Sequence, residues 1–206
     1  FYFSMFIYMM SFSSIFISGE RTSIFYSIIS FTLIYVLFKD FRKIFLIYFI
    51  MGILLIAIIS INYPIIFDRV LFVTLDQINI FSGRLIIFSE VHESHYLTAI
   101  KIFLDHPLFG AGPKIFRELC SFEIYNTGIH ACSTHPHNSY IQLLSETGII
   151  GFVLLIILFF ASFYFIVSAY VIKIIKKTSM INHFQYSLLV MIFINFFPFV
   201  PNGNFF

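Results

Sequence analysis

The chain has 206 residues, of which 60% are hydrophobic and only 11% are charged, and its formal net charge at pH 7 is +2. Soluble domains are about half apolar and about a quarter charged, so this composition excludes an ordinary soluble domain and indicates a membrane protein. The small net charge gives no reason to expect a nucleic-acid partner.

Five apolar stretches are long enough, or nearly long enough, to cross a bilayer, which requires about 20 residues. Strict alternation of polar and apolar residues, the signature of a membrane β-barrel, is absent from the sequence. Because the hydrocarbon core admits only helices or closed barrels, we expect an all-α, polytopic membrane protein with about five transmembrane helices. The expected spans are Phe1–Ser18, Ser23–Phe38, Ile44–Ile61, Ile149–Ile172 and Phe184–Phe197.

The two ends of the chain suggest a fragment of a longer protein. The sequence begins at Phe1 within a hydrophobic run that has no basic segment before it, unlike a signal peptide. It ends abruptly after a helix, at Pro201–Phe206. We therefore expect the chain to be a fragment that is cut at both ends.

Basic residues in short loops predict the orientation of the helices. Residues 39–43, between the second and third spans, contain two Lys and one Arg, and residues 173–177, after the fourth span, contain three Lys. Short cytoplasmic loops are enriched in Lys and Arg, so both loops should be cytoplasmic. The two assignments are independent and agree. Together they place the long segment 62–137 and the short loop at Arg21 on the outer side of the membrane.

The segment from Asn62 to His137 is polar enough to be extracytoplasmic and too long to be a simple connector. Apolar residues at helical spacing predict a helix over Ser82–Asp105, and the residues from Leu108 to Pro113 are typical of a turn. The expected organisation is three transmembrane helices in 1–61, an outer loop in 62–137, an amphipathic helix in 138–147 and two transmembrane helices in 148–206.

The amphipathic helix is predicted from a polar stripe. Asn138, Gln142 and Glu146 recur every fourth residue, opposite apolar positions, as in a helix that lies on the membrane surface. Gly148 and Gly151 then separate this helix from the fourth span.

Two arginines are candidates for binding an anion. Arg21 lies at a membrane boundary, where an arginine is costly and therefore a candidate for function, although it could instead snorkel to the interface or pair with Glu20. Arg84 is expected to open the helix of the outer loop, where the helix N-terminus and a bidentate guanidinium would both attract phosphate or carboxylate. The alternative for Arg84 is a solvated surface residue.

Histidines gather near the end of the outer loop. His130, His135 and His137 precede the amphipathic helix, and His92 and His95 lie one helical turn apart. No recognised zinc-ligand spacing is present, so we predict no metal. A histidine at the start of a membrane-surface helix is suited to proton transfer, and His137 occupies that position.

Cys120 and Cys132 are the two cysteines of the chain, and both lie in the outer loop. An extracytoplasmic compartment permits a disulfide. Closing so short a loop stabilises a protein by roughly 3 kcal/mol in the chain-entropy model, so we favour a Cys120–Cys132 bridge over free thiols.

Four elements of the sequence, in order, resemble the O-antigen ligase and polymerase family. The most specific is His-Pro-His-Asn-Ser-Tyr-Ile-Gln-Leu-Leu-Ser-Glu-Thr-Gly-Ile-Ile-Gly at 135–151, and a second is His-Pro-Leu-Phe-Gly-Ala-Gly at 106–112. Ser-Gly-Glu-Arg at 18–21 and Ser-Gly-Arg at 82–84 are weaker matches. The resemblance covers nearly the whole chain, which would be the C-terminal part of the family's catalytic core.

This resemblance implies a glycosyltransferase of the bacterial inner membrane that needs no metal, nucleotide or other cofactor and whose active site faces the periplasm. The donor would be a glycan on undecaprenyl diphosphate. The acceptor would be lipid A-core in a ligase or another lipid-linked glycan in a polymerase. The family's essential residues would fall on Arg21, Arg84 and His137.

The residues themselves agree with that chemistry. Breaking the bond between sugar C1 and diphosphate builds negative charge, which the cations of Arg21 and Arg84 would stabilise. An acceptor hydroxyl benefits from a base with a pKa near 7, which His137 could supply, and attack opposite the leaving group predicts inversion at C1. The predicted topology puts all three residues on one membrane face. The other hypotheses are a transporter, and a scaffold protein in which the three residues are dispersed.

Overall fold

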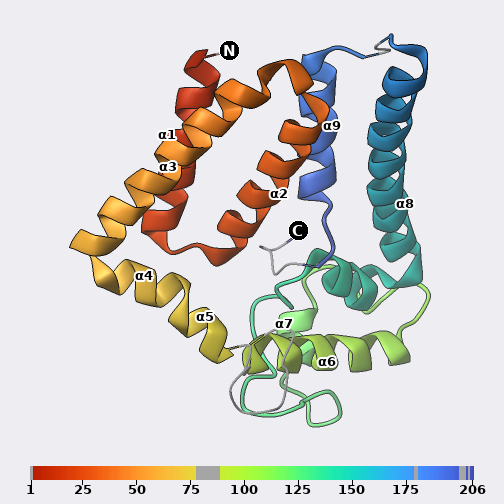
Figure 1. The fold of residues 1–206 in the computed structure, drawn as a ribbon. Coiled ribbons are helices and arrows are strands. Elements are labelled where there is room, and N and C mark those ends of the chain that lie inside the picture. Colours follow the sequence, from red (N-terminus) through yellow and green to blue (C-terminus); the bar gives the residue numbers. More distant parts are fainter. Residues whose placement is uncertain (1, 78–88, 179–180, 200–202, 204) are drawn as a thin grey trace. The chain divides into compact units, whose positions relative to one another are not determined.

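A computed structural model describes residues 2–77, 89–178, 181–199, 203 and 205–206. The chain forms two compact units (Figure 1). Unit 1 consists of Phe1–Asp76 and Ser162–Asn195, and unit 2 of Gln77–Ala161 and Phe196–Phe206. The described residues form helices, turns and loops and contain no β-strand, which confirms the expected all-α class.

Unit 1 contains most of the apolar helices. The chain runs through α1 (Tyr2–Ser18), α2 (Arg21–Leu37), the short 3₁₀ helix η1 (Lys39–Phe41), α3 (Arg42–Asn62), α4 (Pro64–Val70) and α5 (Phe72–Gln77), and it returns through the second part of α8 (Ser139–Lys176) and α9 (His183–Asn195). Helix α1 packs on α3 and α2, and α2 packs on α9. At the centre, the Phe31 ring lies 4.5 Å from the Phe45 ring and 3.9 Å from the Phe49 ring, measured between centroids.

All five predicted spans are helical, but they differ in length. Within the described part of the chain, two stretches are long and apolar enough to cross a membrane, Lys39–Asn62 with 24 residues and Ser139–Lys176 with 38. Helices α1 and α2 have 17 residues each and α9 has 13, so these three are apolar helices shorter than a full span. Large apolar side chains such as Leu154, Phe160 and Phe165 are exposed along α8, as expected of a surface that contacts lipid.

Unit 2 contains α6 (Glu90–Asp105), α7 (Phe116–Leu119) and the first part of α8. One core cluster joins α6 to the following loop through Ala99, Ile102, Phe116, Cys120 and Tyr125. A second cluster surrounds Tyr140, Leu143 and Leu155 of α8, against which Phe196 packs.

The predicted helix over Ser82–Asp105 is helical from Glu90 to Asp105, and its first part, residues 82–88, lies outside the described residues. Helix α6 begins at Glu90, because Ser89 has an extended backbone and its hydroxyl accepts a hydrogen bond from the His92 N–H as the N-cap. Glu90 and Glu93 in the first turn favour this start, since negative charge stabilises a helix N-terminus. Arg84, which was expected to open this helix, also lies outside the described residues.

Helix α8 is interrupted at Gly148, as the sequence predicts. Gly148 has φ 69° and ψ −164°, which divides α8 into an initial helix, Ser139 to Thr147, and a long apolar helix that continues to Lys176. The left-handed φ suits glycine because a Cβ there would collide with the Leu108 carbonyl.

The turn at 107–112 fills this interruption. The N–H groups of Ala111 and Gly112 donate to the carbonyls of Ser145 and Glu146 at 2.9 and 3.0 Å. In return, the Ile149 N–H donates to the Pro107 carbonyl at 2.9 Å. The last carbonyls of the initial helix and the first N–H of the next are thereby satisfied by one loop, although a helix end normally leaves such groups without intrahelical partners.

Candidate functional site

His137 occupies an unusual backbone position directly before α8. Its φ is 61°, in the left-handed region that few non-glycine residues adopt. Asn138 follows and caps the helix, with its side-chain oxygen accepting from the N–H groups of Tyr140 and Ile141 at 3.0 and 3.2 Å. The Asn138 amide also donates to the Pro198 carbonyl at 2.8 Å, which fixes the start of the helix. Such a strained residue, held by its surroundings, is typical of functional sites.

The His137 ring lies among three other histidine rings. Its centroid is 4.2 Å from that of His135, 5.3 Å from that of His95 and 5.5 Å from that of His92. We call these four residues the histidine cluster. The sequence indicates histidines near His137, but it does not reveal that two of them come from α6, more than 40 positions earlier. Among the described residues, no group of three or more His, Cys, Asp or Glu side chains is arranged to hold a metal ion.

Burial and neighbouring charge both lower the pKa of His137. Desolvation, followed by repulsion from His135, His92 and His95, lowers the pKa of His137 to about 4. The pKa of His95 is also lowered, mainly by burial. The pKa of His137 is lower than the value near 7 expected for a base, and a histidine with such a pKa is neutral at neutral pH.

The hydrogen bonds of the cluster leave nitrogen atoms available. His137 Nε2 and the Ser133 hydroxyl are 3.0 Å apart, and no described residue makes a hydrogen bond to His137 Nδ1. Two further ring nitrogens, His95 Nδ1 and His135 Nε2, are buried without a hydrogen-bond partner in the described part of the chain. Buried polar atoms normally find partners, so these nitrogens mark a site where a polar ligand would be stabilised.

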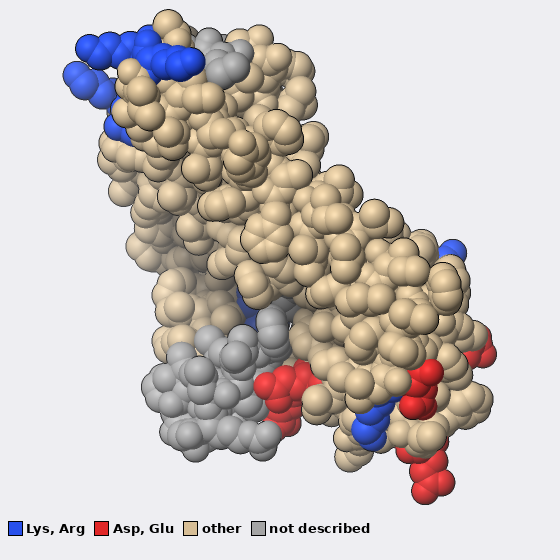
Figure 2. Space-filling view, turned by 90° about the vertical axis from the view of Figure 1, so that its right-hand side faces the viewer, with Lys and Arg blue, Asp and Glu red and all other residues tan. Residues whose placement is uncertain are grey.

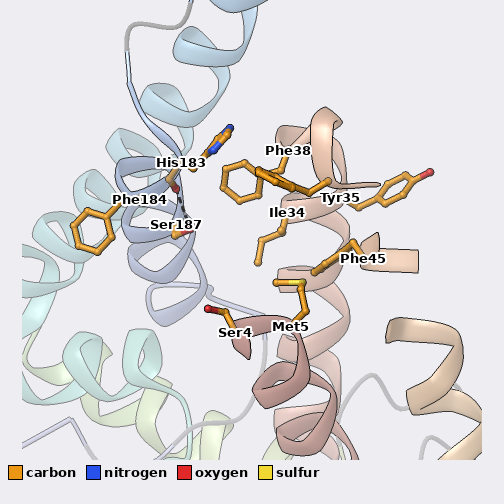
Figure 3. Close-up of a pocket in the computed structure, with 10 residues that line it drawn as sticks. Ser4, Met5, Ile34, Tyr35, Phe38, Phe45, His183, Phe184 and Ser187 are labelled. Atoms are coloured by element: carbon orange, nitrogen blue, oxygen red, sulfur yellow. Dashed lines mark hydrogen bonds between the residues drawn. The ribbon is translucent and has the colours of Figure 1, made fainter. Parts of the chain in front are cut away.

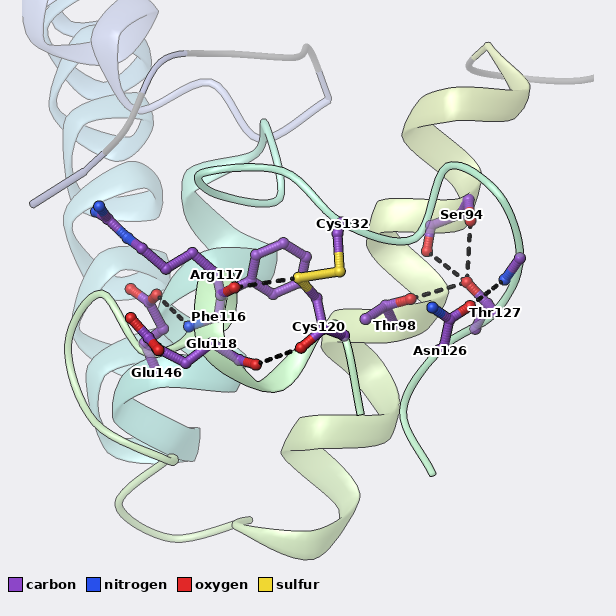
Figure 4. The surroundings of a disulfide bond; sticks show 12 residues. Ser94, Thr98, Phe116, Arg117, Glu118, Cys120, Asn126, Thr127, Cys132 and Glu146 are labelled. Atoms are coloured by element: carbon purple, nitrogen blue, oxygen red, sulfur yellow. Dashed lines mark hydrogen bonds between the residues drawn. A yellow bond between two sulfur atoms is a disulfide. The ribbon is translucent and has the colours of Figure 1, made fainter. Parts of the chain in front are cut away.

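A disulfide-closed loop is attached to α6, the helix that carries His92 and His95 (Figure 4). Cys120 and Cys132 form the disulfide favoured by the sequence, with Cα atoms 5.1 Å apart. Within this loop the Thr127 hydroxyl lies 2.8 Å from the Thr98 hydroxyl and donates to the Ser94 carbonyl at 2.9 Å. Both partners are on α6, so the loop is fixed to the helix that carries His92 and His95.

The polar stripe of the predicted amphipathic helix is buried within unit 2. Asn138 is 4% exposed, Gln142 1% and Glu146 0%, so the stripe does not face water. The Glu146 carboxyl accepts from the Phe116 N–H at 3.2 Å and from the Gln142 amide at 2.9 Å, and the Gln142 oxygen accepts from the Phe205 N–H at 3.0 Å. The stripe therefore joins the helix to two other segments. That the helix lies on the membrane surface remains a prediction.

Arg21 is the first residue of α2 and belongs to unit 1. It is exposed, and its Nη1 lies 3.4 Å from the Thr74 hydroxyl of α5, which it contacts as a hydrogen-bond donor. Glu20 precedes it as the N-cap residue without a side-chain capping bond. Arg21 thus faces the α4–α5 segment at the N-terminal end of α2.

Arg69 of α4 is a candidate that the sequence argument missed. A Cβ on Gly19, two residues before Arg21, would lie 3.1 Å from both Cδ and Nε of Arg69. The Arg69 side chain therefore lies directly against the turn that starts α2, and this approach depends on a glycine whose φ is 70°. Arg69 is exposed and forms no ion pair with a described residue. Its proximity to Arg21 could not be read from residues 48 positions apart in sequence.

The three predicted site residues fall in different parts of the chain. His137 lies in unit 2, Arg21 lies in unit 1, and Arg84 lies outside the described residues. The structure brings His137 together with His92, His95 and His135. It brings Arg21 to Thr74, and it brings Arg69 to Gly19, two residues before Arg21.

These features define a helical protein with membrane-type apolar helices and a polar unit that contains a partly buried histidine cluster. The Wzy_C family, described as O-antigen ligase, matches residues 6–156. Because the match covers nearly three quarters of the 206 residues, the chain belongs to the O-antigen ligase family. Comparison with curated proteins gave no match, and comparison with solved structures gave none either.

Membership confirms the resemblance seen in the sequence. The family consists of bacterial membrane proteins that transfer glycans, and its partners are in general a lipid-linked glycan and an acceptor. The matched region includes the turn at 107–112, the histidine cluster and the break at Gly148.

Proposed function

We propose that the protein transfers a glycan from undecaprenyl diphosphate to an acceptor hydroxyl, with inversion at C1 and without a metal. His137 is the general base. The acceptor oxygen attacks C1 and passes its proton to His137, the C1–oxygen bond to the diphosphate breaks, and undecaprenyl diphosphate leaves. Attack occurs opposite the leaving group, so the configuration at C1 inverts.

The observation that carries this proposal is the protonation state of the His137 imidazole. A base must be unprotonated to accept a proton, and the lowered pKa of His137 keeps the imidazole neutral at neutral pH. Its Nδ1 makes no hydrogen bond with a described residue, while Ser133 can hold Nε2 and thereby fix the tautomer. An anionic diphosphate near the cluster would raise the pKa from about 4 toward its ordinary value and strengthen the base as the donor binds.

The cations of the chain stabilise the leaving diphosphate in this proposal. Arg21 stands at the N-terminus of α2, where the helix dipole also favours an anion. Arg69 lies against the same turn, so an anion there would offset the repulsion between two like charges. Arg84 provides a third cation from the outer loop. Arginine suits this role because its planar guanidinium binds phosphate oxygens in pairs.

The acceptor in the proposal is lipid A-core, as in an O-antigen ligase of the bacterial inner membrane with its site on the periplasmic side. The alternative is a polymerase of O-antigen or exopolysaccharide, which uses the same bond changes with a lipid-linked glycan as acceptor. A membrane transporter is the weaker alternative, because family membership indicates glycan transfer.

The test uses the full-length protein in membranes, with lipid-linked glycan supplied as donor. We expect His137→Ala to abolish transfer both in this assay and in complementation of a mutant strain. His130→Ala is the matched control, because His130 is exposed and lies outside the cluster. Transfer by His137→Ala at the rate of the control would refute the mechanism.

Two further measurements separate the alternatives. Product that forms only when lipid A-core is added identifies a ligase, and longer lipid-linked glycan formed without lipid A-core identifies a polymerase. Chelation with EDTA should leave the rate unchanged, and a loss of activity that added divalent metal restores would contradict a metal-independent reaction.

A further inference from the structure

Unit 1 contains a cavity at the end opposite Arg21. Its volume is about 420 Å³, and it lies between α1, α2, α3 and α9 (Figure 3). Its walls are largely apolar and aromatic, with Met5, Ile34, Phe38 and Phe45 on one side and His183 and Phe184 on α9. This size and lining are typical of a site for a small apolar group.

Each helix that lines the cavity contributes residues near one of its ends. Met5 is near the start of α1, Ile34 near the end of α2, Phe45 near the start of α3 and His183 at the start of α9. Arg21 begins α2, so about 20 Å of helix separates it from Ile34 at a rise of about 1.5 Å per residue. The cavity is therefore distinct from the surroundings of Arg21.

Cations surround this end of unit 1. Residues 39–43 and 173–177 hold six of the twelve Lys and Arg residues and a single acid, Asp40. The two segments lie side by side, because Lys173 Nζ contacts the Leu37 carbonyl at 3.5 Å and Lys39 Nζ lies 5.9 Å from the Tyr170 ring centroid. Figure 2 shows Lys and Arg side chains gathered at the top of the view, with no acidic side chain visible among them.

One of these cations caps a helix, and others are exposed to the surroundings. The Arg42 guanidinium donates to the carbonyls of Tyr35 and Val36 at 2.8 and 3.0 Å, so it caps α2. Lys39 and Lys43 flank Phe41, which lines the cavity, and both are exposed. An apolar cavity with exposed cations beside it matches a molecule that joins a hydrocarbon chain to a phosphate.

We propose that this cavity binds an anionic phospholipid from the adjacent leaflet, which the basic loops predict to be the cytoplasmic one. One acyl chain enters between Phe38, Phe45 and His183, and Lys39 and Lys43 bind the phosphate. Clusters of Lys and Arg between membrane helices favour anionic head groups for the same electrostatic reason. A neutral lipid would fill the cavity but would leave the cations without a counter-charge.

Tryptophan fluorescence gives a direct test, because these 206 residues contain no Trp. Phe41→Trp, in a protein without any other Trp, places a probe at the cavity, and the protein is reconstituted into bilayers containing lipids with brominated acyl chains. We expect brominated phosphatidylglycerol to quench the probe at least about threefold more strongly than brominated phosphatidylcholine at equal mole fraction. Phe165→Trp, at an exposed apolar position of α8, should be quenched equally by both lipids.

Charge variants in the Phe41→Trp protein complete the test. Lys39→Gln combined with Lys43→Gln should remove the preference for phosphatidylglycerol, whereas Lys101→Gln with Lys114→Gln, in unit 2, should retain it. High salt should reduce the preference, since mobile ions screen exposed charges. Equal quenching by both lipids at Phe41→Trp would overturn the proposal. Absence of quenching by either lipid would also overturn it, and is expected if another protein segment fills the cavity. Displacement of the brominated lipid by equimolar undecaprenyl phosphate would overturn it as well.

Discussion

Unit 2 contains a disulfide, a buried carboxyl and four neighbouring histidines, whereas the described part of unit 1 consists mainly of apolar helices joined by aromatic contacts and backbone caps. Helices α1 to α3 face outward with apolar side chains and need few polar links, as suits a lipid environment. Unit 2 holds the His137 ring in place through specific polar and covalent links. Changes to single links should therefore damage unit 2 and leave unit 1 nearly intact.

The largest effect is expected at the break in α8. Gly148→Ala would drive a Cβ into the Leu108 carbonyl at a left-handed φ, so we expect it to destabilise unit 2 by about 3 kcal/mol or more. Hydrogen exchange should show lost protection at Ala111, Gly112 and Ile149, whose N–H groups bond across the break. Gly203→Ala, in the same unit, is the control, because no atom lies within 4 Å of its Cβ position and its φ is not in the left-handed region. Equal effects of the two variants would contradict the close docking of the turn.

The next effect is expected from the disulfide. Replacing Cys120 and Cys132 together with Ser should lower the stability of unit 2 by about 3 kcal/mol, since the closed loop restricts the unfolded chain. Hydrogen exchange of peptides from each unit, measured as the temperature is raised, would show whether unit 2 loses protection at a lower temperature while unit 1 keeps it. Reduction of the wild-type protein should reproduce the effect of the double variant. A parallel loss of protection in α1–α3 would show that the two units do not respond separately.

A smaller effect is expected at the buried carboxyl. Glu146→Ala would leave the Phe116 N–H and the Gln142 amide without an acceptor, which should cost about 2 kcal/mol in the free energy of unfolding. Glu118→Ala, at an exposed position of α7, serves as the matched control and should change stability by less than about 0.5 kcal/mol. The midpoint of thermal unfolding at pH 7 measures both. An equal midpoint for the two variants would mean that the polar stripe does not stabilise the unit.

The smallest effect is expected from mild acid. The pKa of His137 in the folded protein, about 4, is below its ordinary value of 6.5, so folding favours the neutral ring. This contribution to stability is complete above about pH 6.5 and is lost as the pH falls toward 4. The unfolding midpoint of unit 2 should therefore decrease between pH 6.5 and pH 4, and His137→Gln should weaken that decrease. An unchanged pH dependence in His137→Gln would show that other groups control it.

Features set by local sequence were predictable. Apolar runs located the five helices, the two cysteines indicated their bridge, and Gly148 marked the break in α8. The start of α6 was also readable in principle, because Ser89 followed by Glu90 and Glu93 is a recognisable helix start. The apolar spacing that extends back through Phe88 favoured an earlier helix start instead.

Features set by contacts between distant segments were not predictable. The polar stripe at Asn138, Gln142 and Glu146 has the spacing of a solvent-facing helix surface. It is buried because distant segments hydrogen-bond to it, through the Phe116 N–H, the Pro198 carbonyl and the Phe205 N–H. Arg69 has no local signal, because its role depends on the turn at Gly19. The low pKa of His137 likewise depends on α6 lying beside it.

The docking of the turn at 107–112 into the break of α8 has a consequence for how relatives can differ in sequence. A Cβ on Gly110 would meet the backbone of Glu146 and Thr147, and one on Gly148 would meet that of Leu108 and Gly110, so each motif excludes side chains from the other. The two glycines should therefore be retained or altered together, as a covarying pair. Between them, Phe116 and the Cys120–Cys132 disulfide fix the chain to the rest of the unit, but Gly128, Ile129 and His130 are exposed. Family members can therefore accept insertions at residues 128–130 while the contact between the two glycine motifs stays the same.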